Sequence, residues 1–201
     1  MNPKLDTVVK SIQNWNAIKN DKNKLLYYLK EGDHFSLSHI DIGTSLDIHA
    51  YCGILNDKLV FFLIPSEFDN KSQMPDTIVE YITTCPIHPR NDNDVPHEIP
   101  EKEAKKRMLN WKKDLTEWVP KQINTTDGIF QAFAIPSDDI NNFGEPIANF
   151  ALKDSSNPTG YTADLVIIDT TEKGNIYYDT VRPVPPFPPV SDFFLLALAG
   201  V

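Results

Sequence analysis

The chain has 201 residues, of which 41% are hydrophobic and 23% charged, and its 28 acidic against 19 basic residues give a net charge of −9. This length suffices for one sizeable core, and the composition is ordinary for a globular protein. The acidic balance argues against broad contact with a phosphate backbone, because nonspecific binding of DNA or RNA needs a basic face. We therefore expect no nucleic-acid partner.

The sequence carries no pattern that we expect to direct it into or across a membrane. The first ten residues lack a charged head followed by an apolar stretch. No run approaches the ~20 apolar residues that a membrane span requires. The two cysteines, Cys52 and Cys85, are too few for a disulfide framework. Together these features predict a cytoplasmic protein without a membrane span.

The first half begins with a helical pattern and changes to a strand pattern. Apolar residues recur at steps of three and four over residues 5–18, which predicts a helix with a buried face that includes Trp15. A second short helix is expected over residues 21–30, with Gly32 closing it. Residues 54–64 predict a hairpin that turns at Asn56-Asp57. Residues 76–85 are ambiguous, and their β-branched side chains favour a strand.

The second half repeats this order after a polar connector. Residues 89–100, punctuated by prolines, are the best candidate for a boundary. Pro100 suits the first turn of a helix with Trp111 in its buried stripe, and Pro120 is expected to stop that helix. Strand-like runs follow over residues 128–135, 146–153, 163–169 and 175–181, with Gly174 marking a hairpin between the last two.

These elements predict an α+β fold with mainly antiparallel β-sheet and two principal helices. Residues 1–90 and 97–201 each contain a helix followed by antiparallel strands, and the second stretch adds the C-terminal tail. We expect the two stretches to form one compact unit that shares a core. The repeated order raises the hypothesis of two α-ββββ halves, although direct alignment of the halves rises barely above chance.

Several common catalytic motifs are excluded. No two of the eight glycines lie closer than ten residues, which excludes a phosphate-binding P-loop and a dinucleotide-binding turn. His97-Glu98 lacks the second histidine of a helical zinc-protease motif, and no serine has the surroundings of a hydrolase nucleophile. We therefore expect no cofactor, and the exclusions favour a protein that is not an enzyme.

The best candidate metal ligands lie near the connector. Cys85 and His88 form a Cys-x-x-His pair, which can chelate zinc, and His97 follows. Because a structural zinc site needs four ligands and a catalytic site three, we treat Cys85, His88 and His97 as weak candidates and predict no bound metal.

The other histidines lie close to aspartates in the first strand region. His34, His39 and His49 are near Asp33, Asp41 and Asp47 in the sequence. A histidine oriented by a carboxylate could act as a general base. The simpler interpretation places these polar residues on the exposed face of an antiparallel sheet.

The most distinctive segment is the C-terminal tail, residues 182–201. Prolines from Pro183 to Pro189 are expected to form an extended strap that makes no further strand pairing, and Ser191 or Asp192 is expected to cap a short apolar helix. Exposure of its large side chains to water would cost about 1.5–3 kcal/mol each, so we expect them to be buried in the parent core or against a subunit. The residues that we predict for such an interface are Phe193, Phe194, Leu195, Leu196 and Leu198.

Three functional hypotheses follow. The first is a non-catalytic interaction or assembly protein, a homo-oligomer or the binder of another protein, that uses its C-terminal segment as a contact. The second is a small-molecule-binding domain whose pocket is lined by aromatic residues such as Phe61, Phe62, Phe130 and Phe133. The third is an enzyme of unrecognised type.

That third hypothesis would use His88 and His97, or His49, as the reactive groups.

Overall fold

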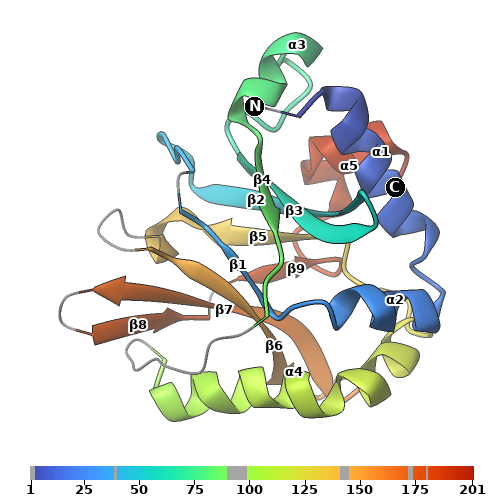
Figure 1. Ribbon diagram of the computed structural model, residues 1–201, viewed down its shortest axis with the longest axis vertical. Helices are drawn as coiled ribbons and strands as arrows, with labels where there is room; N and C mark the ends of the chain where they lie inside the picture. Colours follow the sequence, from blue (N-terminus) through green and yellow to red (C-terminus); the bar gives the residue numbers. More distant parts are fainter. Residues whose placement is uncertain (1–2, 39, 90–98, 141–144, 172–173, 180) are drawn as a thin grey trace.

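The computed structural model describes residues 3–38, 40–89, 99–140, 145–171, 174–179 and 181–201. Over these ranges the chain forms two antiparallel sheets, one of four strands in the order β1-β6-β7-β8 and one of five strands in the order β4-β3-β2-β5-β9. The predicted α+β fold with mainly antiparallel sheet is confirmed (Figure 1).

The helices are α1 (Leu5–Ala17), α2 (Lys22–Leu29), α3 (Pro75–Ile78), α4 (Glu101–Gln122) and α5 (Phe194–Ala199). The strands are β1 (His34–Ser36), β2 (Asp47–Leu55), β3 (Lys58–Pro65), β4 (Thr83–Pro86), β5 (Ala132–Pro136), β6 (Ile147–Asp154), β7 (Tyr161–Thr171), β8 (Gly174–Tyr178) and β9 (Arg182–Val184). No helix within the described ranges is long and apolar enough to cross a membrane.

The elements form four layers, with the largest core between the two sheets. Successive strand residues point to opposite faces, so Phe61 of β3 enters the core between the sheets while Phe62 faces α1 and α5. In the same way, Phe150 of β6 enters the central core, and Ala151 packs against the first half of α4. Figure 1 shows α4 along one side of the molecule, with α1 and α5 next to each other at a distance from it. Both sheets are therefore covered on both faces over much of their area.

Strands from the two halves of the chain are mixed in both sheets. β1 pairs with β6, and β2 pairs with β5, which in turn pairs with β9. Each sheet therefore needs residues from both sides of the connector. Most of the connector, residues 90–98, lies outside the described residues.

Both tryptophans that we expected to anchor helices are buried. Trp15 of α1 is inaccessible to solvent, and its Nε1 donates a hydrogen bond of 2.9 Å to the backbone oxygen of Phe130. Trp111 of α4 is 3% exposed and stacks on Phe150, with ring centroids 4.8 Å apart. The buried faces assigned from the helical period are confirmed.

Two local predictions, one for residues 76–85 and one for Pro120, were wrong. Residues 75–81 form α3 and a following 3-10 turn, and only residues 83–86 form a strand. The β-branched side chains were outweighed by a helix start at Pro75, a position where the missing N–H costs nothing. Pro120 does not stop α4, which runs on to Gln122, because a proline in the last turn removes only one intrahelical hydrogen bond.

The proline-rich strap also departs from expectation, because Arg182–Val184 pairs with β5 as the edge strand β9. An edge strand tolerates Pro183, since only one side of it must donate to a neighbour. The tail helix follows as expected, but its N-cap is Phe193, and neither Ser191 nor Asp192 caps it.

Candidate functional site

A cavity of about 310 Å³ opens between the end of α2, the start of β1 and the middle of α4. Its apolar floor is formed by Leu29, Trp111 and Leu115, all of them buried. The floor exists because α2 ends at Leu29 and the chain then turns away to enter β1, which leaves the flank of α4 uncovered. An apolar floor with a few charged groups around it is the usual make-up of a small-molecule site.

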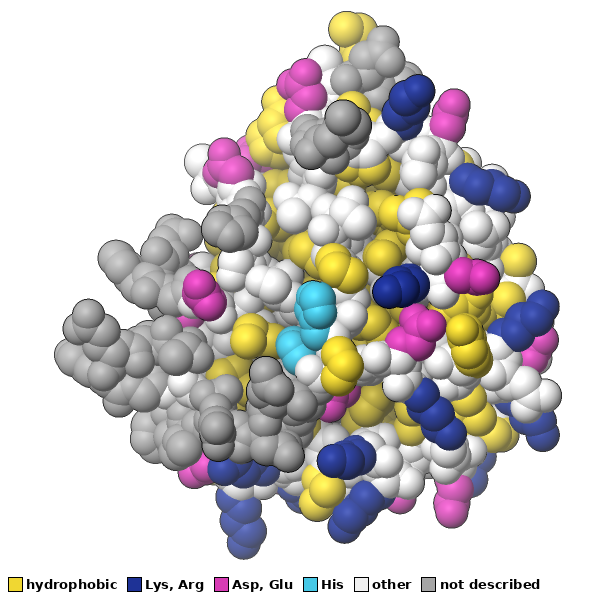
Figure 2. All heavy atoms as spheres, viewed as in Figure 1, with side chains coloured by type: hydrophobic (Ala, Val, Ile, Leu, Met, Phe, Trp, Pro, Cys, Tyr) yellow, Lys and Arg dark blue, Asp and Glu magenta, His cyan; other side chains and the backbone are white. Residues whose placement is uncertain are grey.

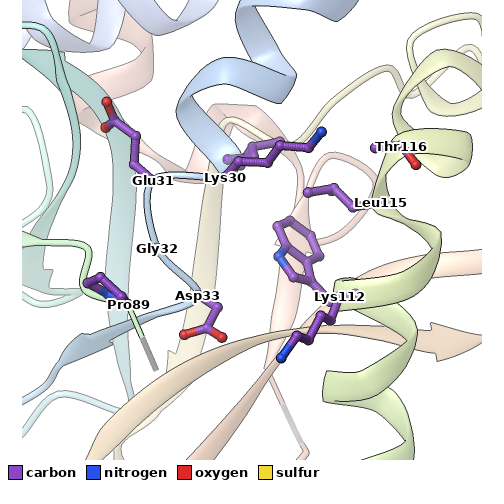
Figure 3. A pocket seen from close by; sticks show the side chains of 10 residues that line it. Lys30, Glu31, Gly32, Asp33, Pro89, Lys112, Leu115 and Thr116 are labelled. Atoms are coloured by element: carbon purple, nitrogen blue, oxygen red, sulfur yellow. The ribbon is translucent and has the colours of Figure 1, made fainter. Parts of the chain in front are cut away.

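Charged side chains surround this floor from both sides. Figure 3 shows Lys30 extending across the cavity towards Thr116, while Asp33 and Lys112 point towards the opposite end. The acidic groups already have partners in the protein: Glu31 accepts a hydrogen bond of 3.3 Å from the backbone N–H of Leu59, and Asp33 Oδ1 lies 3.2 Å from His34 Nδ1.

The two cavity lysines, Lys30 and Lys112, differ from these acidic residues in their ion pairing. Within the described ranges, lysine ion pairs are formed by Lys24, Lys105, Lys106 and Lys153, and neither cavity lysine has one. The cavity therefore presents two ammonium groups without a carboxylate partner in that part of the chain.

Gly32 fixes the wall of the cavity by close backbone packing. A Cβ at this position would lie 2.6 Å from the backbone oxygen of His88, so only glycine allows the two segments to meet. Asp33 N–H donates to that same oxygen over 3.0 Å, and His88 N–H donates to the oxygen of His34 over 2.8 Å. These contacts join the end of β4, in the five-stranded sheet, to β1 of the four-stranded sheet.

The same junction brings two histidines together. His34 and His88 form an isolated antiparallel bridge, and their ring centroids are 5.8 Å apart. Figure 2 shows histidine side chains in contact on this face of the molecule, close to apolar and charged groups. His88, one of the weak candidate ligands, is exposed, and the ring beside it belongs to His34.

Cys85 lies in the core between the sheets, opposite Phe61 on β3. It is 6% exposed, and burial raises the pKa of its thiol to about 12. A thiol must lose its proton to bind a metal strongly, so this position is poorly suited to a ligand. His97 lies outside the described residues, and within them no three or more His, Cys, Asp or Glu side chains are grouped to hold a metal ion.

His49 is buried and has a partner that the sequence did not indicate. Its Nδ1 lies 2.5 Å from Oδ2 of Asp69, and the hydroxyl of Tyr51 donates to the same oxygen. Burial raises the pKa of Tyr51 well above its usual value. The His49 ring stacks on Phe193 of the tail at 4.0 Å. The expectation that His49 lies on an exposed sheet face was wrong, because α5 covers that face; His39 is outside the described residues.

The tail residues that we expected at an interface divide into two groups. Phe193, Leu195 and Leu196 are inaccessible and belong to the core beneath α1 and α5, whereas Phe194 is partly exposed and Leu198 is 41% exposed. The tail thus packs on its own chain, and the predicted subunit contact now depends on its two accessible side chains.

The aromatic residues suggested for a pocket are buried and do not line the cavity. Phe61, Phe130 and Phe133 lie in the core between the sheets, and Phe62 lies beneath α1. The helical pattern predicted that Trp111 is buried, but it could not indicate that Trp111 would form part of a cavity floor. The one available signal was Gly32, assigned to the end of a helix.

A separate group of charges joins α4 to the four-stranded sheet. Arg107 donates to Glu103 over 2.9 Å, to Asp164 over 3.1 Å and to Asp179 over 2.8 Å. Burial raises the pKa of Asp164 to about 7, although Arg107 acts to lower it. Because Arg107 is only 7% exposed and satisfied by these three carboxylates, the group serves to position α4.

Comparison of this chain with protein-family models, with curated proteins and with solved structures finds no match.

Proposed function

We propose that the protein binds a small organic anion with an apolar body in the cavity between α2, β1 and α4. The observation that carries this proposal is the pairing of an apolar floor, centred on Trp111, with the two lysines Lys30 and Lys112 that have no ion pair among the described residues. A carboxylate or phosphate would satisfy those ammonium groups while its apolar body covers the floor.

The sign of the ligand charge follows from the partners of the acidic groups. Glu31 and Asp33 are occupied by the Leu59 N–H and by His34, so they have less capacity to hold a ligand cation. The volume of about 310 Å³ is at the lower end of the range for small-molecule sites, which favours a compact ligand of one ring or a short branched chain.

The test compares ligands that share a ring and differ in charge. Phenyl phosphate, benzoate and benzylamine are titrated into uniformly labelled protein, and amide shifts are followed by heteronuclear NMR. We expect the two anions to shift the signals of Gly32, the Trp111 indole N–H and Thr116, while benzylamine leaves them unchanged. Preference for benzylamine, or shifts confined to other parts of the chain, would refute the proposal.

Variants locate the binding energy within the cavity. Lys112→Gln should weaken phenyl phosphate binding by about tenfold, because it removes one charge-assisted contact. Lys113→Gln is the matched control, since Lys113 is exposed on the same helix but does not line the cavity. Equal losses for both variants would show that only the general charge of α4 matters.

Assembly through the tail is a second proposal, supported by the exposure of an apolar side chain. Leu198 of α5 is 41% exposed, and Phe194 is partly exposed on the same short helix. Leu198→Glu should lower the molecular mass measured by light scattering if a homo-oligomer forms there. Leu109→Glu, at a leucine of α4 that is 44% exposed, is the control and should leave the mass unchanged. A mass equal to one chain in the wild-type protein would exclude self-assembly.

A further inference from the structure

The junction of the two sheets places two imidazole rings at a separation that suits a shared metal ion. His34 opens β1 and His88 follows the end of β4, and the bridge between them directs both side chains to one face. Their ring centroids lie 5.8 Å apart, with 39° between the ring planes. The segments are held by the backbone hydrogen bonds of His88 to Asp33 and His34, so this separation is set by the fold.

One of the two rings is already oriented. Asp33 Oδ1 lies 3.2 Å from Nδ1 of His34, so this nitrogen carries the proton when the ring is neutral and Nε2 keeps its lone pair. A carboxylate on the far nitrogen is the usual support of a metal-binding histidine, because it fixes the tautomer and raises the basicity of the ligating nitrogen. Asp33 is therefore suited to the role of a positioning residue.

The distance agrees with coordination of a single ion. A metal lies about 2.1 Å from an imidazole nitrogen, hence about 3.2 Å from the ring centroid. Two such arms at a tetrahedral angle would place the centroids about 5.2 Å apart. The observed 5.8 Å differs from this by an amount that a small side-chain rotation can remove.

The surroundings leave room for an open coordination shell. The His34 side chain is 17% exposed and His88 is exposed, so water can reach both rings. The chain's net charge of −9 also favours the approach of a cation. Cys85, the sulfur candidate of the sequence, is in the core on the other side of the strand end and cannot join them without rearrangement.

We propose that His34 and His88 together bind one divalent transition-metal ion of the class that prefers imidazole, such as Zn²⁺ or Cu²⁺, with Asp33 as positioning residue and water in the remaining positions. The site lies beside the anion cavity, since Asp33 belongs to both, but it does not rest on the proposed anion binding. The sequence suggested Cys85 and His88 as the pair; the fold replaces Cys85 with His34.

The experiment uses the full chain freed of metal with a chelator. Zinc chloride is titrated by calorimetry, and we expect one equivalent to bind. His34→Gln and His88→Gln should each lower the affinity at least tenfold. Asp33→Asn should lower it by about tenfold through loss of the oriented tautomer. Cys85→Ala, checked for folding by circular dichroism, is the control and should bind zinc as the wild type does.

A second measurement needs no variant to fold. Cu²⁺ added at one equivalent to the wild-type protein should give an electron paramagnetic resonance spectrum with hyperfine coupling to two imidazole nitrogens. Three results would each overturn the inference: full zinc affinity in either histidine variant, loss of affinity in Cys85→Ala, or absence of a 1:1 complex. Neither metal experiment contains an organic ligand, so a negative result for metal binding does not bear on the anion proposal.

Discussion

Shortening Leu196 to alanine separates a tail that completes its own core from one that is held by another subunit. Leu196 lies on the inner side of α5 with no exposed surface and packs in the core beneath α1, together with Phe193 and Leu195. Leu198, two residues later on the same helix, is 41% exposed. The two leucines have the same chemistry and nearly the same place in the sequence, so Leu198→Ala is the matched control.

The expected magnitudes follow from burial. Leu196→Ala removes a fully buried side chain and leaves a cavity, which costs about 2–5 kcal/mol of unfolding free energy. In a chain of this length each kcal/mol lowers the melting temperature by about 2–4 °C, so a fall of roughly 4–20 °C is expected. Leu198→Ala should cost less than about 1 kcal/mol, because much of that side chain is already in water.

The assay is urea unfolding followed by tryptophan fluorescence, at several protein concentrations. We expect the midpoint of Leu196→Ala to fall at unchanged slope, independently of concentration. Equal effects of the two substitutions would refute the orientation of α5. A loss in Leu196→Ala that disappears at high protein concentration would refute packing within one chain.

Three further outcomes are expected. Because burial raises the folded-state pKa of Asp164 to about 7 from an ordinary value of 3.8, the folded protein binds this proton more tightly than the unfolded chain. The contribution of Asp164 to stability should therefore decline from about pH 4 to pH 7. Chemical denaturation should show the stability of wild type relative to Asp164→Asn falling over that range, and a constant difference would contradict the raised pKa. Gly32→Ala should cost about 1–3 kcal/mol by thermal unfolding, since its Cβ would lie 2.6 Å from the oxygen of His88; a neutral effect would mean that the junction yields. The thiols of Cys52 and Cys85 should resist Ellman's reagent until the protein is unfolded, because both are buried with raised pKa values, and rapid labelling of the native protein would show an open core.

The sequence by itself determined the elements whose signals are local. The helical stripes around Trp15 and Trp111 specify their buried faces, because residues three and four apart share one side of a helix. The Asn56-Asp57 turn is equally local: both residues adopt positive φ, of 51° and 61°, which asparagine and aspartate tolerate and which a tight hairpin requires. The apolar tail likewise indicated its own burial.

Only the tertiary structure decided which distant segments pair and which of their side chains meet. The pairing of β1 with β6 and of β2 with β5 joins segments that are far apart in the sequence. Strands that are buried on both faces lack the alternation of polar and apolar residues, so their sequences do not indicate which strands they pair with. Asp69, which follows the end of β3, is the partner of His49, although nearer aspartates were available in the sequence. His34 and His88 meet because Gly32 lets two sheet edges approach to backbone contact, a distance that residue spacing does not encode.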